Sequence, residues 1–91
     1  MTKKLYIVYV LESLIDQSWY IGQTSNLKER IKRHNNKKEI STKSKAPYKI
    51  IYLEGYLYRA DAMRREKYLK SGAGRNKLKD RLFLYMKKRN K

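Results

Sequence analysis

Five side chains of this sequence could act together on a charged substrate: Tyr9, Tyr20, Arg30, His34 and Glu66. Phenol and imidazole groups transfer protons, a guanidinium neutralises an oxyanion, and a carboxylate binds hard divalent cations. Tyr20 follows Tyr9 by eleven residues, and Arg30 follows Tyr20 by ten. A site made from these residues requires the elements that carry them to fold onto one another.

The two tyrosines are expected on neighbouring strands. Two apolar runs, Leu5 to Leu11 and Trp19 to Gly22, flank the polar segment Glu12 to Ser18. This pattern predicts a β-hairpin with a long connection. Because a hairpin brings its strands side by side, Tyr9 and Tyr20 can direct both phenols to one surface of the sheet.

The remaining elements predict an α/β (α+β) fold in the order ββαβαα, a small three-stranded mixed or antiparallel sheet flanked by about three helices. Asn26 can cap the first helix together with Glu29, three residues further on. Gly55 is expected to mark a bulge or bend near the end of the third strand. The predicted segments are a helix from Asn26 to Asn35 or Asn36, a loop from Lys37 to Pro47, a strand from Tyr48 to Tyr58, a helix from about Ala60 to Lys70, a helix-stopping stretch from Ser71 to Gly74, and a helix from Asn76 to about Lys88.

Arg30 and His34 are expected on the same face of the first helix. Leu27, Ile31 and His34 form an apolar stripe at helical spacing, and Arg30 lies beside His34 one turn earlier. Considered alone, Arg30 is best interpreted as a solvated cation, and His34 as a residue at the core boundary that packs or caps the helix. Their position after the two tyrosines is what favours a functional interpretation.

Glu66 occupies a core-facing position of the second predicted helix, on a stripe with Ala62 and Leu69. A carboxylate among apolar residues must be paired, protonated or bound to a metal. A structural salt bridge to Arg30, or to Lys70 at i+4, explains it at least as well as a metal does. The alternative is a single Mg²⁺ or Mn²⁺, since these ions usually take one or two carboxylates together with phosphate oxygens.

The composition predicts a polyanionic partner. The sequence has 24 Lys and Arg against 8 Asp and Glu, a formal net charge of +16. The absence of cysteine excludes disulfides and thiolate zinc sites, and a lone histidine argues against a zinc enzyme. No apolar run approaches the roughly 20 residues of a membrane span, and no cleavable signal is evident. We therefore expect one soluble, cytoplasmic domain over residues 1–91 that binds nucleic acid, DNA above all, with a protein partner left open.

Basic residues from Arg64 onward, and the polar loop from Lys37 to Pro47, are expected to contact phosphates, and binding is expected to be strongly salt-dependent. The tail from Lys87 to Lys91 is expected to be frayed and solvated. The residues predicted to bind nucleic acid are Lys43, Lys45, Arg64, Arg65, Lys70, Arg75 and Lys77.

Nearly the whole chain resembles the GIY-YIG nuclease family, and most of all its small single-domain members. The second motif is intact as Tyr20-Ile21-Gly22, whereas the first reads Ile7-Val8-Tyr9 and lacks the glycine. Arg30 and Glu66 match the arginine and acidic positions. Asn76 is a loose match to a late asparagine and is left outside the core set. The motif glycine, Gly22, is expected to let the backbone pass close to the first helix or the substrate.

The resemblance implies a divalent-metal-dependent DNA endonuclease. Tyr9 would take a proton from water, with His34 accepting that proton or orienting Tyr9, and Tyr20 would orient water or phosphate. A base role for Tyr9 requires that its phenolate be favoured by its surroundings, because a free tyrosine has a pKa near roughly 10. Arg30 would neutralise charge on the phosphorane, and Glu66 would hold a single Mg²⁺ or Mn²⁺.

Two other interpretations remain open. One is a non-catalytic basic DNA- or RNA-binding module on a nuclease scaffold, and the other is a basic structural domain with a salt-bridged Glu66. Pure binding needs cations but has no use for a carboxylate on a core-facing stripe. That carboxylate favours hydrolysis.

Overall fold

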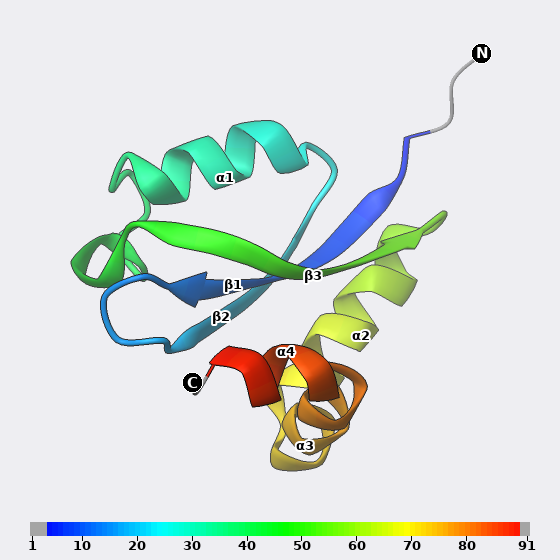
Figure 1. Ribbon diagram of the computed structural model, residues 1–91. Helices are drawn as coiled ribbons and strands as arrows, with labels where there is room; N and C mark the ends of the chain where they lie inside the picture. The colour runs from blue at the N-terminus through cyan, green and yellow to red at the C-terminus, as the bar shows by residue number, and fades with distance from the viewer. Residues whose placement is uncertain (1–3, 90–91) are drawn as a thin grey trace.

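In the computed structural model, which describes residues 4–89, three strands and four α-helices form one α+β unit in the order ββαβααα (Figure 1). The predicted fold class and the three-stranded sheet are confirmed, with one helix more than expected. The strands are β1 (Tyr6–Ser13), β2 (Trp19–Thr24) and β3 (Tyr48–Tyr56). The helices are α1 (Leu27–Asn35), α2 (Arg59–Lys70), α3 (Gly72–Arg81) and α4 (Phe83–Arg89), with a short 3₁₀ turn at Lys43–Lys45.

The sheet is antiparallel and has the order β2-β1-β3, so the hairpin predicted from the two tyrosine-bearing runs is confirmed. Tyr9 lies in the central strand directly opposite Gly22 of β2. The β1–β3 ladder shifts register between Val10 and Leu11, whose partners are Tyr52 and Ile50. The bulge therefore does not lie at Gly55, where it was expected, since Gly55 pairs regularly with Ile7.

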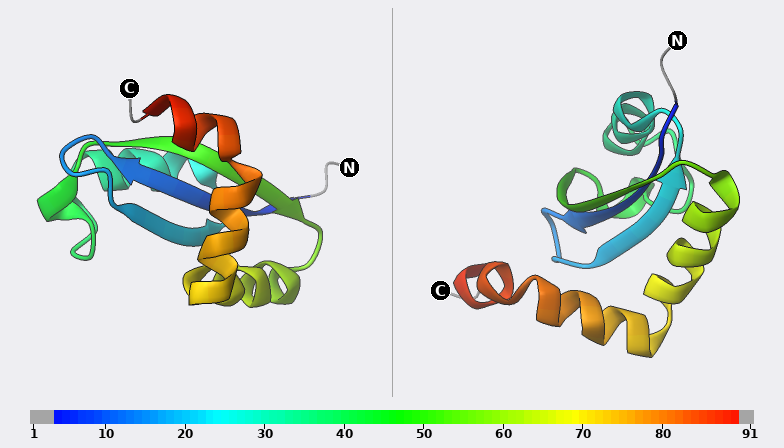
Figure 2. Two further views of the ribbon diagram at one scale, coloured as in Figure 1. Left: turned by 60° about the horizontal axis from the view of Figure 1, so that its bottom comes forward. Right: turned by 90° about the vertical axis from the view of Figure 1, so that its right-hand side faces the viewer.

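The side chains of alternate β1 residues pack into two separate hydrophobic cores, one on each face of the sheet. Val8 and Val10 pack with Ala62 and Leu69 on the face covered by α2 and α3. Tyr9 and Leu11 pack on the face covered by α1. Figure 2 shows α1 on one side of the sheet and α2–α4 on the other. Tyr9 can therefore interact only with groups on the α1 side or at the sheet edges.

The expected start and end of α1 are confirmed. The Asn26 side chain accepts a hydrogen bond from the backbone N–H of Glu29 at 3.2 Å, which satisfies one free amide of the first turn. The helix ends at Asn35. The Asn35 side chain then accepts from the backbone N–H of Tyr48 at 2.7 Å. This contact fixes the end of α1 against the start of β3.

The segment Ser71 to Gly74 stops the second helix as predicted, since α2 ends at Lys70, but α3 begins at Gly72 and not at Asn76 as expected. The Ser71 hydroxyl accepts from the Gly74 backbone N–H at 3.1 Å, as an N-cap does. A Cβ at Gly74 would lie 2.0 Å from the carbonyl oxygen of Tyr68. Gly74 is thus required because α3 turns closely against the end of α2. The helical region also breaks at Leu82, which separates α3 from α4.

The C-terminal helix is anchored to the hairpin rather than frayed up to Arg89, which corrects the expectation for the tail; residues 90 and 91 lie outside the described part. Glu12 is 1% exposed and accepts from the Trp19 indole N–H at 2.9 Å. It also accepts from the Tyr85 hydroxyl and the Arg89 guanidinium. Although burial opposes ionisation, these donors lower the pKa of Glu12. α4 is therefore held on the sheet by a buried, ionised carboxylate.

Candidate active site

Tyr9 and Gly22 form the base of the site through a close cross-strand contact. A Cβ at Gly22 would lie 2.6 Å from the Tyr9 hydroxyl oxygen and 2.7 Å from the ring carbon that carries it. Tyr9 is fully buried, so its ring has little room to move aside. The missing side chain of Gly22 therefore makes room for the Tyr9 ring, which corrects the expected approach to α1, while the expected approach to the substrate stays a prediction.

A chain of hydrogen bonds connects Tyr9 to the loop that follows α1. His34 Nδ1 lies 2.8 Å from the Thr42 hydroxyl, which itself faces the Glu39 carbonyl at 3.5 Å. A Thr42 hydroxyl that donates to this carbonyl favours the tautomer with the proton on Nδ1, in which Nε2 accepts from the Tyr9 hydroxyl at 3.0 Å. The Tyr9 proton is thus already directed at a base.

The electrostatics of Tyr9 and His34 favour the neutral form of both groups. Burial lowers the pKa of His34, although the carboxylate of Glu39 opposes this. Burial is also the main cause that raises the pKa of Tyr9, and Tyr20 and Glu66 add to it, while the charge of Arg30 acts in the opposite direction. A free Tyr9 phenolate is therefore not favoured in the protein alone. A base role for Tyr9 alone requires a favoured phenolate, and this requirement is not met.

Tyr20 covers the Tyr9–His34 pair. Its ring centroid lies 4.9 Å from that of His34 and 6.3 Å from that of Tyr9. Tyr20 is partly exposed, whereas the other two side chains are buried. The prediction that both phenols lie on one surface of the hairpin is confirmed, and Tyr20 forms its outer layer.

Arg30 stands at the edge of a polar pocket of about 300 Å³ beside this cluster. The pocket lies where β1 begins and β2 ends, and its other cations are Lys4 and Arg59. No acidic side chain is among the described residues that line it. Three cations around one polar cavity are suited to holding phosphate oxygens. Lys4 and Arg59 were not singled out in the sequence because they are far apart along a chain that is basic throughout.

Glu66 approaches from α2, on the opposite face of the sheet from α1. Its side chain is 22% exposed, between the buried Ala62 and Leu69, as the stripe predicted. It pairs with Lys70 at 2.9 Å, which is one of the two salt bridges considered; no pair with Arg30 occurs in the described part of the chain. Since its charge raises the pKa of Tyr9, Glu66 acts on the same site as Arg30 from across the edge strand β2.

The donor set for a metal is small. Within residues 4–89, no group of three His, Cys, Asp or Glu side chains could hold a cation on its own. Glu66 is partly exposed, and its Lys70 partner is 52% exposed and can leave at little cost. One carboxylate with open coordination positions fits a Mg²⁺- or Mn²⁺-type ion that completes its shell with water and phosphate oxygens.

The sequence did not identify Thr42 as part of this site. It lies in a polar loop that was expected to face phosphates, and its side chain is instead fully buried against His34. Nothing in the local pattern of charges and hydroxyls distinguishes it from its exposed neighbours. Only the folding of the loop under α1 brings it to the histidine.

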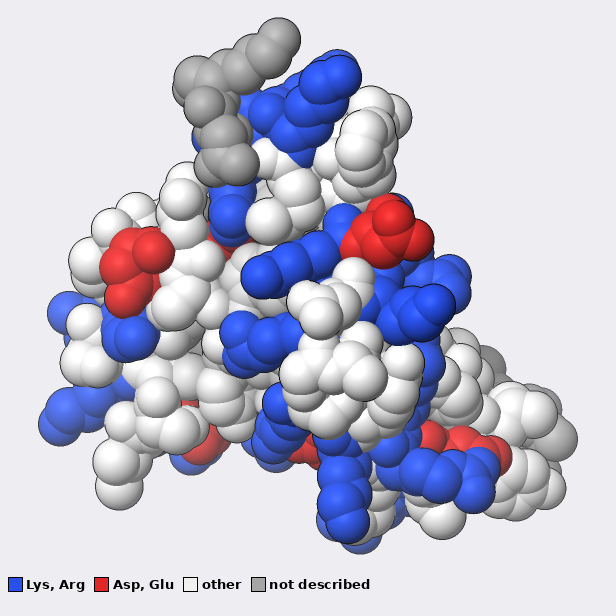
Figure 3. Space-filling view, turned by 90° about the horizontal axis from the view of Figure 1, so that it is seen from below, with Lys and Arg blue, Asp and Glu red and all other residues white. Residues whose placement is uncertain are grey.

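The residues predicted to bind nucleic acid differ in how far their charge is already paired. Arg65 pairs with Glu54 and is largely covered, with a side chain only 28% exposed. Figure 3 shows Lys and Arg side chains gathered over the face formed by α2, α3 and α4. Of the other residues predicted to bind nucleic acid, three are paired: Lys45 with Asp16, Arg64 with Asp61 and Lys70 with Glu66. The other three, Lys43, Arg75 and Lys77, have no ion pair within residues 4–89.

The described helices include none that is long and apolar enough to cross a membrane.

Comparison with known proteins gives matches over most of the chain. The model of the GIY-YIG catalytic domain matches residues 5–79. A UPF0213 protein of Clostridium perfringens is 39% identical over 72 residues, which cover 78% of this chain and 76% of that protein. A UPF0213 protein of Staphylococcus haemolyticus is 36% identical over 75 residues, covering 81% and 90% respectively. The solution NMR structure of a UPF0213 protein of Bacillus halodurans is similar with a TM-score of 0.52 at 31% identity, covering 81% of each chain.

Proposed function

This chain belongs to the GIY-YIG catalytic domain family, and on this premise we propose that it is a divalent-metal-dependent endonuclease that hydrolyses phosphodiester bonds of DNA. One observation carries the proposal: Tyr9, Tyr20 and His34, from β1, β2 and α1, lie in contact, and the charges of Arg30 and Glu66 both shift the pKa of Tyr9, in opposite directions. Phosphodiester hydrolysis needs a proton acceptor for the attacking water, stabilisation of charge on the non-bridging oxygens, and help for the leaving oxygen.

The proton path runs from water through Tyr9 to His34. As a water molecule attacks phosphorus, its proton passes to the Tyr9 oxygen while the Tyr9 proton passes to Nε2 of His34. The tyrosine is a neutral phenol before and after the transfer, so its raised pKa is no obstacle. The positive charge is left on His34, which Thr42 holds in place through Nδ1.

The Tyr9 hydroxyl must become accessible for this transfer, because Tyr9 and His34 are both fully buried in the unliganded protein. Tyr20 and Arg30 are the partly exposed side chains beside it. A phosphate that draws Arg30 outward would open the site to water. Substrate binding and access of the nucleophile are then coupled.

Substrate phosphates are held by the polar pocket that Arg30 lines with Lys4 and Arg59. The guanidinium of Arg30 neutralises charge that develops on the non-bridging oxygens, where a bidentate contact is strongest. The two outer cations would position a flanking phosphate. Tyr20 orients the attacked group through its hydroxyl.

Glu66 would hold the divalent cation of this family's chemistry, which polarises the scissile phosphate and stabilises the leaving oxygen when bound. Lys70 pairs with this carboxylate at 2.9 Å and would have to release it to a cation. An exposed i,i+4 pair contributes only about 0.3–0.5 kcal/mol. The exchange of Lys70 for a metal therefore costs little.

A second function, a non-catalytic nucleic-acid-binding module, is favoured by a different observation. Glu66 is already neutralised by Lys70, so the carboxylate does not need a metal in order to be satisfied. The net charge of +16 would suffice for sequence-independent binding. This alternative predicts tight, salt-sensitive binding without cleavage.

The proposal is tested by incubating labelled single-stranded, duplex and branched DNA with the protein in Mn²⁺, Mg²⁺ or EDTA. We expect cleavage that disappears in EDTA, in Glu66→Gln and in Tyr9→Phe. Glu29→Gln, which changes an exposed glutamate of α1, is the matched control and should cleave normally. Binding without cleavage of any substrate would support the alternative. Cleavage that survives in Glu66→Gln would show that this site is not the source of the activity.

A further inference from the structure

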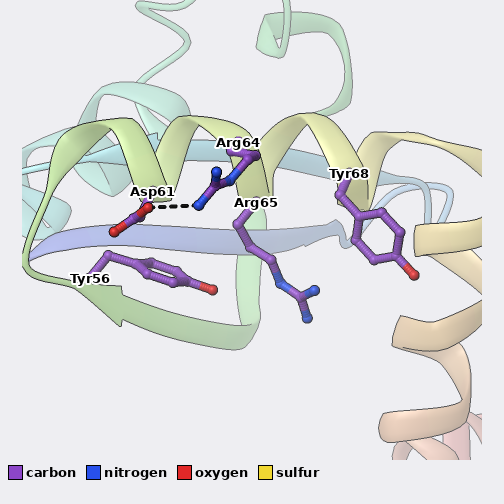
Figure 4. Close-up of a pocket in the computed structure, with 5 residues that line it drawn as sticks. All are labelled: Tyr56, Asp61, Arg64, Arg65 and Tyr68. Carbon is purple, nitrogen blue, oxygen red and sulfur yellow. Dashed lines mark hydrogen bonds and ion pairs between the residues drawn. The ribbon is translucent and has the colours of Figure 1, made fainter.

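A second pocket lies between α2 and the end of β3, on the other flank of α2 from Glu66. Its volume is about 460 Å³, and it is lined by Tyr56, Asp61, Arg64, Arg65 and Tyr68. Asp61, Arg65 and Tyr68 follow one another at i, i+4 and i+7, so they form a single stripe of the helix. Figure 4 shows the rings of Tyr56 and Tyr68 on either side of the Arg65 guanidinium. The proposed active site makes no use of this pocket.

The wall of the pocket is held rigidly in place by Glu54. This carboxylate accepts two hydrogen bonds at 2.9 Å from the Arg65 guanidinium, one from Nε and one from an NH₂ group. It also accepts from the hydroxyls of Tyr52 and Tyr56, each at 2.5 Å. Burial and the Glu54 hydrogen bond raise the pKa of Tyr56 to about 12, so the phenol stays neutral. The positions of Arg65 and Tyr56 are thus fixed before any ligand binds.

The floor of the pocket is flat and aromatic. The Arg65 guanidinium lies over the Tyr68 ring at 5.3 Å from its centroid. Tyr68 remains 38% exposed, so part of its ring is open to a ligand. Planar heteroaromatic rings stack on tyrosine and on guanidinium planes. The exposed part of the Tyr68 ring and the guanidinium plane of Arg65 are therefore the two flat surfaces on which a planar ring can stack.

The charge of the pocket sets it apart from the rest of this basic molecule. Arg65 is neutralised by Glu54, and Arg64 forms an ion pair of 2.8 Å with Asp61 at the rim. The Arg64 side chain is 82% exposed and that of Asp61 45%, so both can turn towards a ligand. The rim then supplies one group of donors and one of acceptors without net charge. A phosphate would gain little here, whereas a ring with donors and acceptors on its edge is well matched.

We propose that this pocket binds an unpaired nucleobase, which stacks on Tyr68 and Arg65 while Asp61 and Arg64 contact its edge. If the chain is the nuclease proposed above, its substrates carry a single-stranded segment that reaches around α2 from the cleavage site. A base within a duplex is already stacked and paired, so it cannot enter.

The test is a binding titration by fluorescence anisotropy in EDTA, with labelled oligothymidylate, oligouridylate and a blunt DNA duplex of equal length. Each stacked base contributes about 1–3 kcal/mol, so Tyr68→Ala should weaken binding of both single strands by about 5- to 150-fold. Duplex binding, which depends on phosphate contacts, should change less than about twofold. Tyr68→Phe retains the ring and should bind as the wild type does. Tyr68→Leu, which keeps apolar bulk without an aromatic plane, should behave like Tyr68→Ala and guards against a folding defect in the smaller variant.

The matched control is Tyr58→Ala, since Tyr58 is 70% exposed, lies at the N-cap of the same helix and does not line the pocket. It should leave single-strand binding unchanged. An equal loss for single strands and duplex, no loss in Tyr68→Ala and Tyr68→Leu, or the same loss in Tyr58→Ala would overturn the proposal. Loss for oligouridylate alone would restrict the site to RNA and overturn it as a site for DNA.

Because binding is measured without metal, the two proposals fail separately. Selective loss of single-strand binding in a protein that cleaves nothing would leave the nucleobase pocket standing and remove the nuclease. Metal-dependent cleavage with no effect of Tyr68→Ala on binding would support the nuclease and overturn the nucleobase pocket.

Discussion

Gly22→Ala is the substitution whose effect the structure defines most sharply. The added methyl group would lie 2.6 Å from the Tyr9 hydroxyl oxygen and 3.2 Å from a ring carbon of Tyr20. Real Cβ contacts are essentially never shorter than 3.0 Å. Tyr9 is fully buried and hydrogen-bonded to His34, so its ring can yield only by breaking that bond or by pushing the strands apart.

The cost can be estimated from two contributions. Overpacking of a close-packed core costs about 1–3 kcal/mol, and loss of the Tyr9–His34 hydrogen bond adds about 0.5–1.5 kcal/mol. For a domain of this size, each kcal/mol lowers the Tm by roughly 4–8 °C. Because the proton path depends on the Tyr9–His34 bond, we also expect cleavage to fall by at least about 10²-fold.

The assay is thermal unfolding followed by circular dichroism, together with the cleavage rate. Gly55→Ala is the matched control in the same sheet, since its Cβ would make only ordinary contacts of 3.5 and 3.6 Å with Leu5 and Ile7. It should be as stable as the wild type or more so, because alanine has less backbone freedom to lose in a strand. An equal Tm for Gly22→Ala and the wild type would refute the close packing of Tyr9 on Gly22.

Three further predictions concern other parts of the fold. Gly74→Ala should destabilise the protein by about 3 kcal/mol or more in urea unfolding, because its Cβ would meet a backbone carbonyl at 2.0 Å. Gly72→Ala, with open space around its Cβ, should stabilise the protein by up to about 1 kcal/mol, and equal effects of the two substitutions would contradict the close turn of α3 on α2. Glu12→Gln should cost about 1.5–3 kcal/mol and increase amide hydrogen exchange in α4, since it removes the ionised acceptor of Arg89, and unchanged exchange would show that α4 is held by other contacts. Because burial lowers the pKa of His34 below its ordinary value of about 6.5, His34 takes up a proton in the unfolded chain first as the pH falls. The contribution of neutral His34 to stability is therefore complete above about pH 6.5 and is lost below it. The wild type should lose more unfolding free energy between pH 7 and 5 than His34→Gln does, and parallel profiles would contradict a buried, neutral His34.

The sequence was sufficient to predict the parts of the fold that depend on local pattern. Alternation of apolar residues identified the hairpin, and the helical spacing of Leu27, Ile31 and His34 gave the correct buried face of α1. The N-cap at Asn26 was readable because an asparagine with a glutamate three residues later is a local signal. These features involve contacts within one element or between adjacent strands.

Features that depend on packing between elements were missed. The helix stop near Ser71 was predicted correctly, but the immediate start of α3 at Gly72 was not, because it depends on Gly74 packing on the Tyr68 carbonyl. Lysine and arginine in the tail suggested solvation, whereas Arg89 is bound by Glu12 from the other end of the chain. Such partners are invisible to any local pattern.

The candidate site was partly predictable for the same reason. The identities of Tyr9, Tyr20, Arg30, His34 and Glu66 followed from motif spacing, but their protonation states did not. Burial, which raises the pKa of Tyr9 and lowers that of His34, follows only from the packing of α1 on the sheet. Of the two roles expected for His34, that packing favours acceptance of the Tyr9 proton, because a free Tyr9 phenolate is disfavoured.

The most direct test of the central claim is to follow the oxygen that enters the product. Cleavage of a DNA substrate is carried out in water labelled with heavy oxygen, with Mn²⁺ present, and the product ends are analysed by mass spectrometry. The account predicts one labelled oxygen on the phosphate end and none on the hydroxyl end left by each cleavage, formed by the wild type and lost together with cleavage in Tyr9→Phe and Glu66→Gln. Absence of cleaved product, or full labelling of product by Tyr9→Phe and Glu66→Gln, would contradict it.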